Sequence, residues 1–88
     1  MPNLNYTTPL HNFSSGNLSF TATKECYLCG SISGSGAYTV NINGTALFTT
    51  AWSNTLYNSK SIPCMKLNAG DTVTVGNAMN NLFVLDVL

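Results

Sequence analysis

The sequence predicts an all-β protein, a compact antiparallel β-sandwich or jelly roll of about seven or eight short strands. Three observations predict it. Apolar and polar residues alternate in several short segments, which is the period of a half-buried strand. β-Branched residues, aromatics, Gly and Asn dominate, and no window keeps an apolar stripe at helical spacing without a Gly or a Pro. Turn residues separate the segments at intervals of about ten residues.

The clearest predicted element is a β-hairpin in residues 38–52. Apolar and polar side chains alternate through residues 38–42. Asn43 and Gly44 then supply the two positive-φ positions of a type I′ turn. Residues 45–52 return as the second strand.

Five further segments are predicted strands: 18–23, 26–33, 62–67, 72–75 and 82–88. The connections between them are a break at residues 24–25, a turn at residues 68–71 and loops at residues 34–36, 53–61 and 76–81. Pro63 suits an edge strand or a strand start, because proline has no amide to donate. The last segment, LFVLDVL, is almost wholly apolar, which predicts burial on both faces, inside the domain or between subunits.

Two parts of the chain are predicted. Residues 1–17 form an N-terminal arm or edge strand, and residues 18–88 form the β-sandwich head domain. The first part is rich in Asn, Thr and Ser, but it also holds four apolar residues that can anchor it: Leu4, Tyr6, Leu10 and Phe13.

Charged residues make up 7% of the chain, against about 25% in an average soluble protein, and the formal net charge is zero. Nucleic acids and acidic membranes attract basic surfaces, so neither is an expected partner. So few charges protect a monomer poorly against association, which predicts a homo-oligomer. No apolar run approaches the length of a membrane span, and no signal peptide is visible. We expect synthesis in a cytoplasm and no membrane insertion.

Cys26 and Cys29 form a CxxC motif, and Cys64 is the third cysteine. Zinc requires about four ligands, and only Cys64 and His11 are available to complete a set. Redox-active CxxC pairs open a helix, whereas residues three apart in a strand point to opposite faces. We expect free thiols with a structural role and no cofactor. A disulfide from Cys64 to one of the pair, or a metal or redox role, is the alternative.

Groups suited to catalysis are few. His11 is the only histidine, and no G-x-S-x-G motif surrounds a serine. We expect His11 to be exposed or to lie between subunits. Gly70 and Asp71 are typical of a turn, and Asp86 is expected to face solvent or to pair with a lysine. The prediction is a non-enzymatic protein; a small hydrolase or a thiol redox protein is the alternative in the enzyme class.

Four residues after the hairpin are candidates for a ligand or receptor surface: Trp52, Asn54, Tyr57 and Asn58. Sugar-binding surfaces often combine exposed aromatic rings with neighbouring amides, which this group provides. The alternative is that Trp52 and Tyr57 pack within the protein or at a subunit contact.

Three runs together resemble a known family: SFTAT at residues 19–23, ING at residues 42–44 and LNAGDTVTV at residues 67–75. They are similar to small head domains of bacteriophage and prophage fibre or appendage proteins, which have a jelly-roll fold of the tumour-necrosis-factor and C1q type. The likeness covers about residues 17–88. Its motifs are turns and strand edges, so they carry no catalytic residue over to this chain.

The resemblance implies a homotrimer in a virion, made in the cytoplasm of a bacterial host. The expected function is structural or adhesive, with other virion proteins and a host-surface glycan or protein as partners. Three copies would raise weak contacts to useful avidity. Two alternatives stay open: a stand-alone carbohydrate-binding module, and a capsid decoration or assembly protein without a receptor.

Overall fold

The computed structural model describes residues 2–34, 39–49, 58–76 and 81–88. These residues contain no helix, so the predicted all-β class is confirmed. The eight strands are β1 (His11–Asn12), β2 (Ser19–Thr21), β3 (Cys26–Gly34), β4 (Thr39–Ile42), β5 (Thr45–Thr49), β6 (Asn58–Leu67), β7 (Thr72–Val75) and β8 (Leu82–Asp86).

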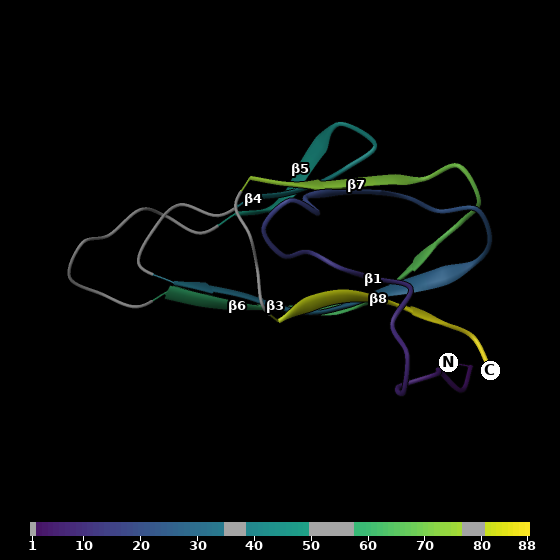
Figure 1. Cartoon of the computed structure of the whole chain (residues 1–88). Coiled ribbons are helices and arrows are strands. Elements are labelled where there is room, and N and C mark those ends of the chain that lie inside the picture. Colours follow the sequence, from purple (N-terminus) through teal and green to yellow (C-terminus); the bar gives the residue numbers. More distant parts are fainter. Residues whose placement is uncertain (1, 35–38, 50–57, 77–80) are drawn as a thin grey trace.

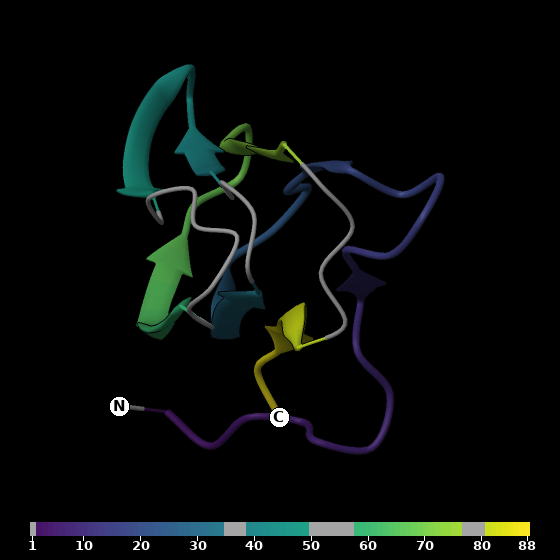
Figure 2. The ribbon, with the colours of Figure 1, turned by 90° about the vertical axis from the view of Figure 1, so that its left-hand side faces the viewer.

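The strands form two antiparallel sheets of four, with the orders β1-β8-β3-β6 and β2-β7-β4-β5. We call them the first and the second sheet; Figures 1 and 2 show them as two facing layers. The pairs are nested: β1 pairs with β8, β2 with β7, β3 with β6, and β4 with β5. Further pairing of β3 with β8 and of β4 with β7 joins the pairs within each sheet. This is the strand order of a jelly roll, a long hairpin rolled into a two-layer sandwich.

The predicted hairpin is present as β4 and β5. Asn43 and Gly44 have φ values of 52° and 83°, so both occupy the left-handed region that a type I′ turn requires. An irregularity in the pairing register falls between Val40 and Asn41. β5 is described as far as Thr49, three residues short of the predicted strand end.

Strand β3 divides the apolar side chains between two clusters. Cys26, Leu28 and Ile32 point into the main core between the sheets, whereas Tyr27 and Cys29 point to the opposite face of the first sheet. The alternation follows directly from the period of two along a strand. The main core consists of Phe13, Ala22, Cys26, Leu28, Ile32, Val40, Ile62, Leu67, Val73, Val75, Leu82 and Val84.

The opposite face of the first sheet carries a second cluster, which we call the outer cluster: Leu4, Tyr27, Cys29 and Leu85, with Phe83 and Val87 packed against it. β8 contributes to both sides, because Leu82 and Val84 face the main core while Leu85 faces the outer cluster. The predicted burial on both faces is therefore confirmed for Leu82, Val84 and Leu85 within a single chain, whereas Leu88 at the end of the run is 79% exposed.

The N-terminal residues run beside β8 as an interrupted edge strand. Leu4 forms an isolated antiparallel bridge with Val87 and is buried. Backbone hydrogen bonds continue this contact along β8: Leu88 N to Asn3 O, Asn5 N to Asp86 O, Leu10 N to Val84 O and Phe13 N to Leu82 O. The segment thus closes one edge of the first sheet and covers part of the outer cluster.

Two loop predictions are wrong at their boundaries. β6 begins at Asn58, so the last four residues of the expected loop at residues 53–61 belong to a strand. β3 continues through Gly34, which was assigned to a loop. In both cases the polar ends of β3 and β6 pair with each other over Gly34–Asn58 to Gly30–Ile62, a contact between distant segments that local sequence does not report.

Pro63 lies where prediction placed it, on an edge strand. The register between β3 and β6 shifts between Leu28, opposite Met65, and Gly30, opposite Ile62. Two residues of β6, Pro63 and Cys64, therefore lie opposite the single residue Cys29. A bulge on an edge strand is a place where a missing amide costs no ladder hydrogen bond.

Candidate functional site

Three of the four residues predicted to form a ligand surface, Trp52, Asn54 and Tyr57, lie outside the described residues. The fourth, Asn58, begins β6, and its backbone pairs with Gly34 of β3. The ligand surface stays a prediction. What the structure adds is the position of the strand ends that flank residues 50–57.

These flanking strand ends lie at one end of the sandwich, which we call the β5–β6 end. β5 finishes there at Thr49, which pairs with the first residue of β4, Thr39. β6 begins there at Asn58, which pairs with the last residue of β3. In sequence, residues 35–38, 50–57 and 77–80 follow β3, β5 and β7, and none of these three segments contains a charged residue.

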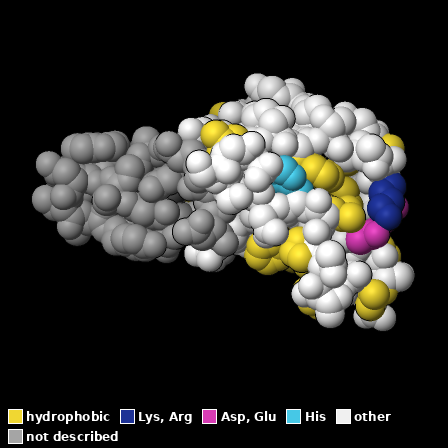
Figure 3. All heavy atoms as spheres, viewed as in Figure 1, with side chains coloured by type: hydrophobic (Ala, Val, Ile, Leu, Met, Phe, Trp, Pro, Cys, Tyr) yellow, Lys and Arg dark blue, Asp and Glu magenta, His cyan; other side chains and the backbone are white. Residues whose placement is uncertain are grey.

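Charged side chains gather at the opposite end, which we call the charged end. It holds five of the six charged residues of the chain: Lys24, Glu25, Lys66, Asp71 and Asp86. The register explains the grouping, because Cys26 at the start of β3 lies beside Leu67 on one side and Asp86 on the other. Figure 3 shows the charged atoms visible on one face together at one end of the molecule.

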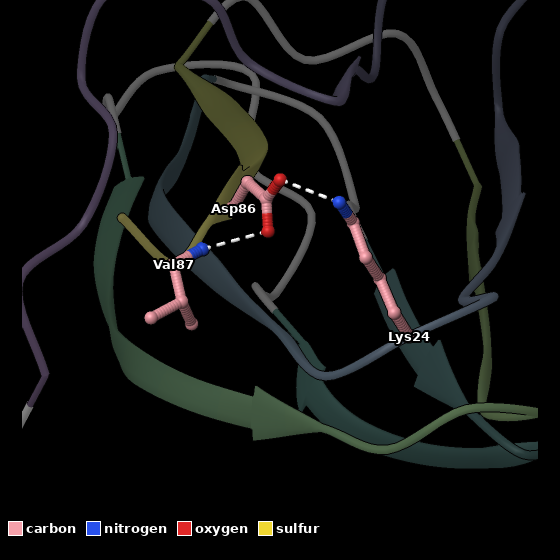
Figure 4. Close-up of polar contacts among 3 residues, drawn as sticks. All are labelled: Lys24, Asp86 and Val87. Carbon is pink, nitrogen blue, oxygen red and sulfur yellow. Dashed lines mark hydrogen bonds and ion pairs between the residues drawn. The ribbon is translucent and has the colours of Figure 1, made fainter.

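The closest ion pair at this end joins Lys24 Nζ to Asp86 Oδ2 at 2.6 Å (Figure 4). The other carboxylate oxygen of Asp86 accepts a hydrogen bond from the backbone amide of Val87 at 2.8 Å. Both interactions favour the ionised form, and the Lys24 hydrogen bond is the main reason that the pKa of Asp86 lies below its usual range. The expected pairing of Asp86 with a lysine is confirmed. Lys66 and Glu25 form a looser exposed pair at 3.5 Å.

Two turns at the charged end are joined through side chains. Asn43 Oδ1 accepts a hydrogen bond from the amide of Thr72 at 2.9 Å, and Asn43 Nδ2 donates to Asp71 Oδ1 at 3.1 Å. The second oxygen of Asp71 accepts from the amide of Asn68 at 2.8 Å. The Asn68 bond, followed by the Asn43 bond, lowers the pKa of Asp71. Gly70, at φ 94°, completes the turn.

The three thiols occupy different environments. Cys26 is fully buried in the main core, Cys29 is buried in the outer cluster, and Cys64 is exposed on β6. The prediction that Cys26 and Cys29 point to opposite faces is confirmed. Burial is the main reason that the pKa of the Cys26 thiol is raised, with the nearby Asp86 carboxylate adding to it.

Cys29 and Cys64 meet across the β3–β6 edge. The Cys29 thiol donates a hydrogen bond to Cys64 Sγ, with the sulfur atoms 2.7 Å apart. Burial and then this hydrogen bond raise the pKa of Cys29 to about 12. All three cysteines are free thiols in this structure.

His11 is half-buried on β1. Its Nε2 lies 3.0 Å from the carbonyl oxygen of Asn17, and its ring is 4.6 Å from that of Phe13 and 5.2 Å from that of Phe20, measured between centroids. The ring therefore lies beside aromatic side chains at the sandwich edge. Pairing of β1 with β8 therefore leaves the His11 side chain only partly exposed, and a position between subunits stays a prediction.

Within the described ranges, no group of three His, Cys, Asp or Glu side chains is arranged to hold a metal ion. Among the side chains of those same ranges, every buried polar nitrogen and oxygen has a hydrogen-bond partner. The part of the chain that the structure describes also contains no helix long and apolar enough to cross a membrane.

Comparison with known proteins adds no relative: no family model, no curated protein and no solved structure matches this chain.

The contact between Asn43 and Asp71 was not expected from the sequence, because these residues are 28 positions apart and meet only through strand pairing. A contact of Cys64 with one residue of the CxxC pair was among the expected alternatives, and the structure shows that this residue is Cys29. The one local signal was Pro63, whose place at a bulge moves Cys64 opposite Cys29.

Proposed function

We propose that this protein is a non-enzymatic structural or adhesion module of a phage or prophage particle, and that it forms a trimeric head that binds a host-surface receptor. The observation that carries the proposal is the separation of the two ends of the jelly roll. One end holds five of the six charged residues in ion pairs and tight turns, and the other joins its strands through uncharged segments.

The uncharged segments favour a neutral ligand. Residues 50–57, with the sequence TAWSNTLY, combine a tryptophan and a tyrosine with hydroxyl and amide side chains. Aromatic rings provide large contact area, and hydroxyls and amides provide adaptable hydrogen bonds without the desolvation cost of a charge. A neutral cell-surface glycan, or an uncharged patch of a surface protein, fits this chemistry better than an anionic polymer.

The termini offer a surface for association between chains. Tyr6 and Leu88 are 75% and 79% exposed, and Leu10 is 40% exposed. Tyr6 and Leu10 lie on the N-terminal segment that runs beside β8, and Leu88 follows β8 and bonds to the same segment through Asn3. Apolar side chains that stay in water in a chain with so few charges favour association, and a closed trimer removes them from solvent.

Binding to host cells tests the proposal. Fluorescently labelled protein is titrated onto intact bacteria and onto arrays of surface glycans, with Trp52→Ala compared with Lys66→Ala as a matched control from the charged end. We expect Trp52→Ala to lose binding while its thermal unfolding and molar mass stay unchanged, and Lys66→Ala to bind as the unaltered protein does. A neutral ligand also predicts binding that changes little between low and high salt.

The alternatives give different results in the same assay. A stand-alone carbohydrate-binding module binds glycans as a monomer. A capsid decoration or assembly protein binds the particle and neither cells nor glycans. Binding that is lost in Lys66→Ala and kept in Trp52→Ala would contradict the assignment of the receptor surface to the β5–β6 end.

A further inference from the structure

Two thiols, those of Cys29 and Cys64, meet at the edge of the first sheet. Their sulfur atoms are 2.7 Å apart across the two paired strands β3 and β6. Cys64 is exposed, whereas Cys29 is buried in the outer cluster. One thiol of the pair therefore meets solvent, and the other lies directly behind it.

The contact between the two sulfur atoms, which lie on paired neighbouring strands, favours a bridge with little change in the backbone. Directly opposed residues of antiparallel strands have Cα atoms about 4.5–5.5 Å apart, within the range of about 4.4–6.8 Å that a disulfide spans. The bulge at Pro63 and Cys64 places two residues opposite Cys29, and the hydrogen bond shows that the Cys64 side chain turns toward it. The third cysteine, Cys26, points to the other face of the same sheet and is excluded from this contact.

We propose that Cys29 and Cys64 form a thiol–disulfide modification site, which reacts with a low-molecular-weight disulfide such as oxidised glutathione and closes a cross-link between β3 and β6. The proposal does not depend on the function proposed above, because it rests only on the two thiols and the strand pairing.

The reaction proceeds in two exchange steps. The exposed Cys64, as thiolate, attacks one sulfur of the small disulfide; its S–S bond breaks, one thiolate leaves, and Cys64 carries a mixed disulfide. Cys29 Sγ then attacks the Cys64 sulfur, and its proton passes to the second departing thiolate. Two protein thiols are oxidised, and the small disulfide is reduced to two thiols.

The cross-link would hold the edge strand β6 against β3. β6 is the outermost strand of the first sheet and pairs only with β3 among the described strands. A bond between residues 29 and 64 closes a long loop and restricts the unfolded chain. We expect the oxidised protein to melt about 10 °C or more above the reduced protein. The protein should therefore be less stable to unfolding in a reducing compartment and more stable in an oxidising one.

The experiment exposes the purified full chain to buffers of varied oxidised-to-reduced glutathione ratio, then alkylates the remaining thiols. Trypsin cuts after Lys24, Lys60 and Lys66, so Cys64 appears in peptide 61–66 and the other two cysteines in peptide 25–60. Cys26→Ala is the matched control, because it leaves Cys29 as the only cysteine of the larger peptide. Fragment spectra of the unaltered protein make the same assignment if that variant folds poorly.

We expect the unaltered protein and Cys26→Ala to lose two hydrogen atoms in mass, to yield peptide 25–60 linked to peptide 61–66, and to gain thermal stability. In Cys29→Ser the reaction should end at a glutathione adduct on Cys64, and this variant should gain no thermal stability. The proposal is overturned if the unaltered protein keeps a glutathione adduct on Cys64, if Cys26 forms the link, if the link joins two chains, or if no thiol reacts.

Discussion

Asn43 Nδ2 donates a hydrogen bond of 3.1 Å to Asp71 Oδ1, and this bond joins the β4–β5 turn to the turn that precedes β7. The Asn43 side chain also accepts a hydrogen bond from the amide of Thr72. One residue thus both forms a turn in the left-handed region and holds a second turn beside it. The β4–β5 turn and the turn before β7 are therefore connected at the charged end.

The first prediction concerns these side-chain hydrogen bonds of Asn43. Asn43→Ala should lower the free energy of unfolding by about 1–2 kcal/mol, because alanine loses both side-chain hydrogen bonds and tolerates a positive φ poorly. Asn43→Gly keeps the turn and loses only the hydrogen bonds, so it should cost less. Urea denaturation measures both. If the cost of Asn43→Gly is the same with and without Asp71→Ala, the two side chains are not coupled.

The second prediction is acid sensitivity. The pKa values of Asp71 and Asp86 are lower in the folded protein than in the unfolded chain. A carboxylate of this kind contributes stability above its unfolded pKa and loses it as the pH falls through the folded pKa. The melting temperature should therefore fall as the pH drops below about 5. Lys24→Gln should make this fall in melting temperature less steep, whereas Lys66→Gln, which removes the looser pair, should leave it nearly unchanged. Equal effects of the two substitutions would contradict the assignment of the acid sensitivity to the Lys24–Asp86 pair.

The third prediction concerns Gly30, where β3 passes close to the start of β8. Its φ is +126°, and an added Cβ would lie 1.8 Å from the backbone carbonyl oxygen of Asn81. The same oxygen accepts a hydrogen bond from the amide of Ser31 at 2.9 Å, so moving it away from the new Cβ would disturb this bond. Gly30→Ala should cost more than about 3 kcal/mol or prevent folding.

Gly16→Ala is the matched control for Gly30→Ala. Gly16 has a φ of +83° but nothing within 4 Å of an added Cβ, so alanine there carries only the backbone cost of about 1–2 kcal/mol. Comparison of the two midpoints in urea separates steric overlap from backbone strain. Similar losses in both variants would show that the close approach to Asn81 is unimportant.

The fourth prediction concerns thiol reactivity. Burial raises the pKa of Cys26, and burial with the Cys64 hydrogen bond raises the pKa of Cys29 to about 12, so neither thiol ionises near neutral pH. Iodoacetamide at pH 8 should label Cys64 alone in the native protein and all three cysteines in urea. Rapid labelling of Cys26 or Cys29 in the native state would instead favour the redox role considered for the CxxC motif.

Much of the fold follows from local sequence. The hairpin turn at Asn43 and Gly44 was predictable because only a few residue types adopt two successive positive φ values. The opposite orientations of Cys26 and Cys29 followed from strand periodicity alone. Pro63 on an edge strand followed from its missing amide.

The remainder depends on contacts between distant segments. The polar start of β6 at Asn58 resembles a loop by composition, and it becomes a strand because β3 pairs with it. The neighbours of His11 are a further example, because pairing of β1 with β8 places its ring beside Phe13 and Phe20. The proposed ligand residues Trp52, Asn54 and Tyr57 lie outside the described residues, so their role is proposed from the chemical character of their side chains alone.

The fifth prediction places the contact between chains on the terminal surface. Tyr6→Ser combined with Leu88→Ser should lower the average molar mass in solution, because these are the most exposed large apolar side chains among the described residues. Leu47→Ser is the matched control, since Leu47 is 48% exposed but lies on β5 of the second sheet. If only Leu47→Ser lowers the molar mass, the contact between chains lies on the second sheet and not at the termini.

The most direct test of the account is the molar mass of the unaltered protein by light scattering coupled to size-exclusion chromatography. One chain has a mass of 9.4 kDa. A trimeric head should give a single species with the mass of three chains, stable on dilution. A monodisperse single chain across the same concentrations would contradict the trimeric head and favour the stand-alone carbohydrate-binding module.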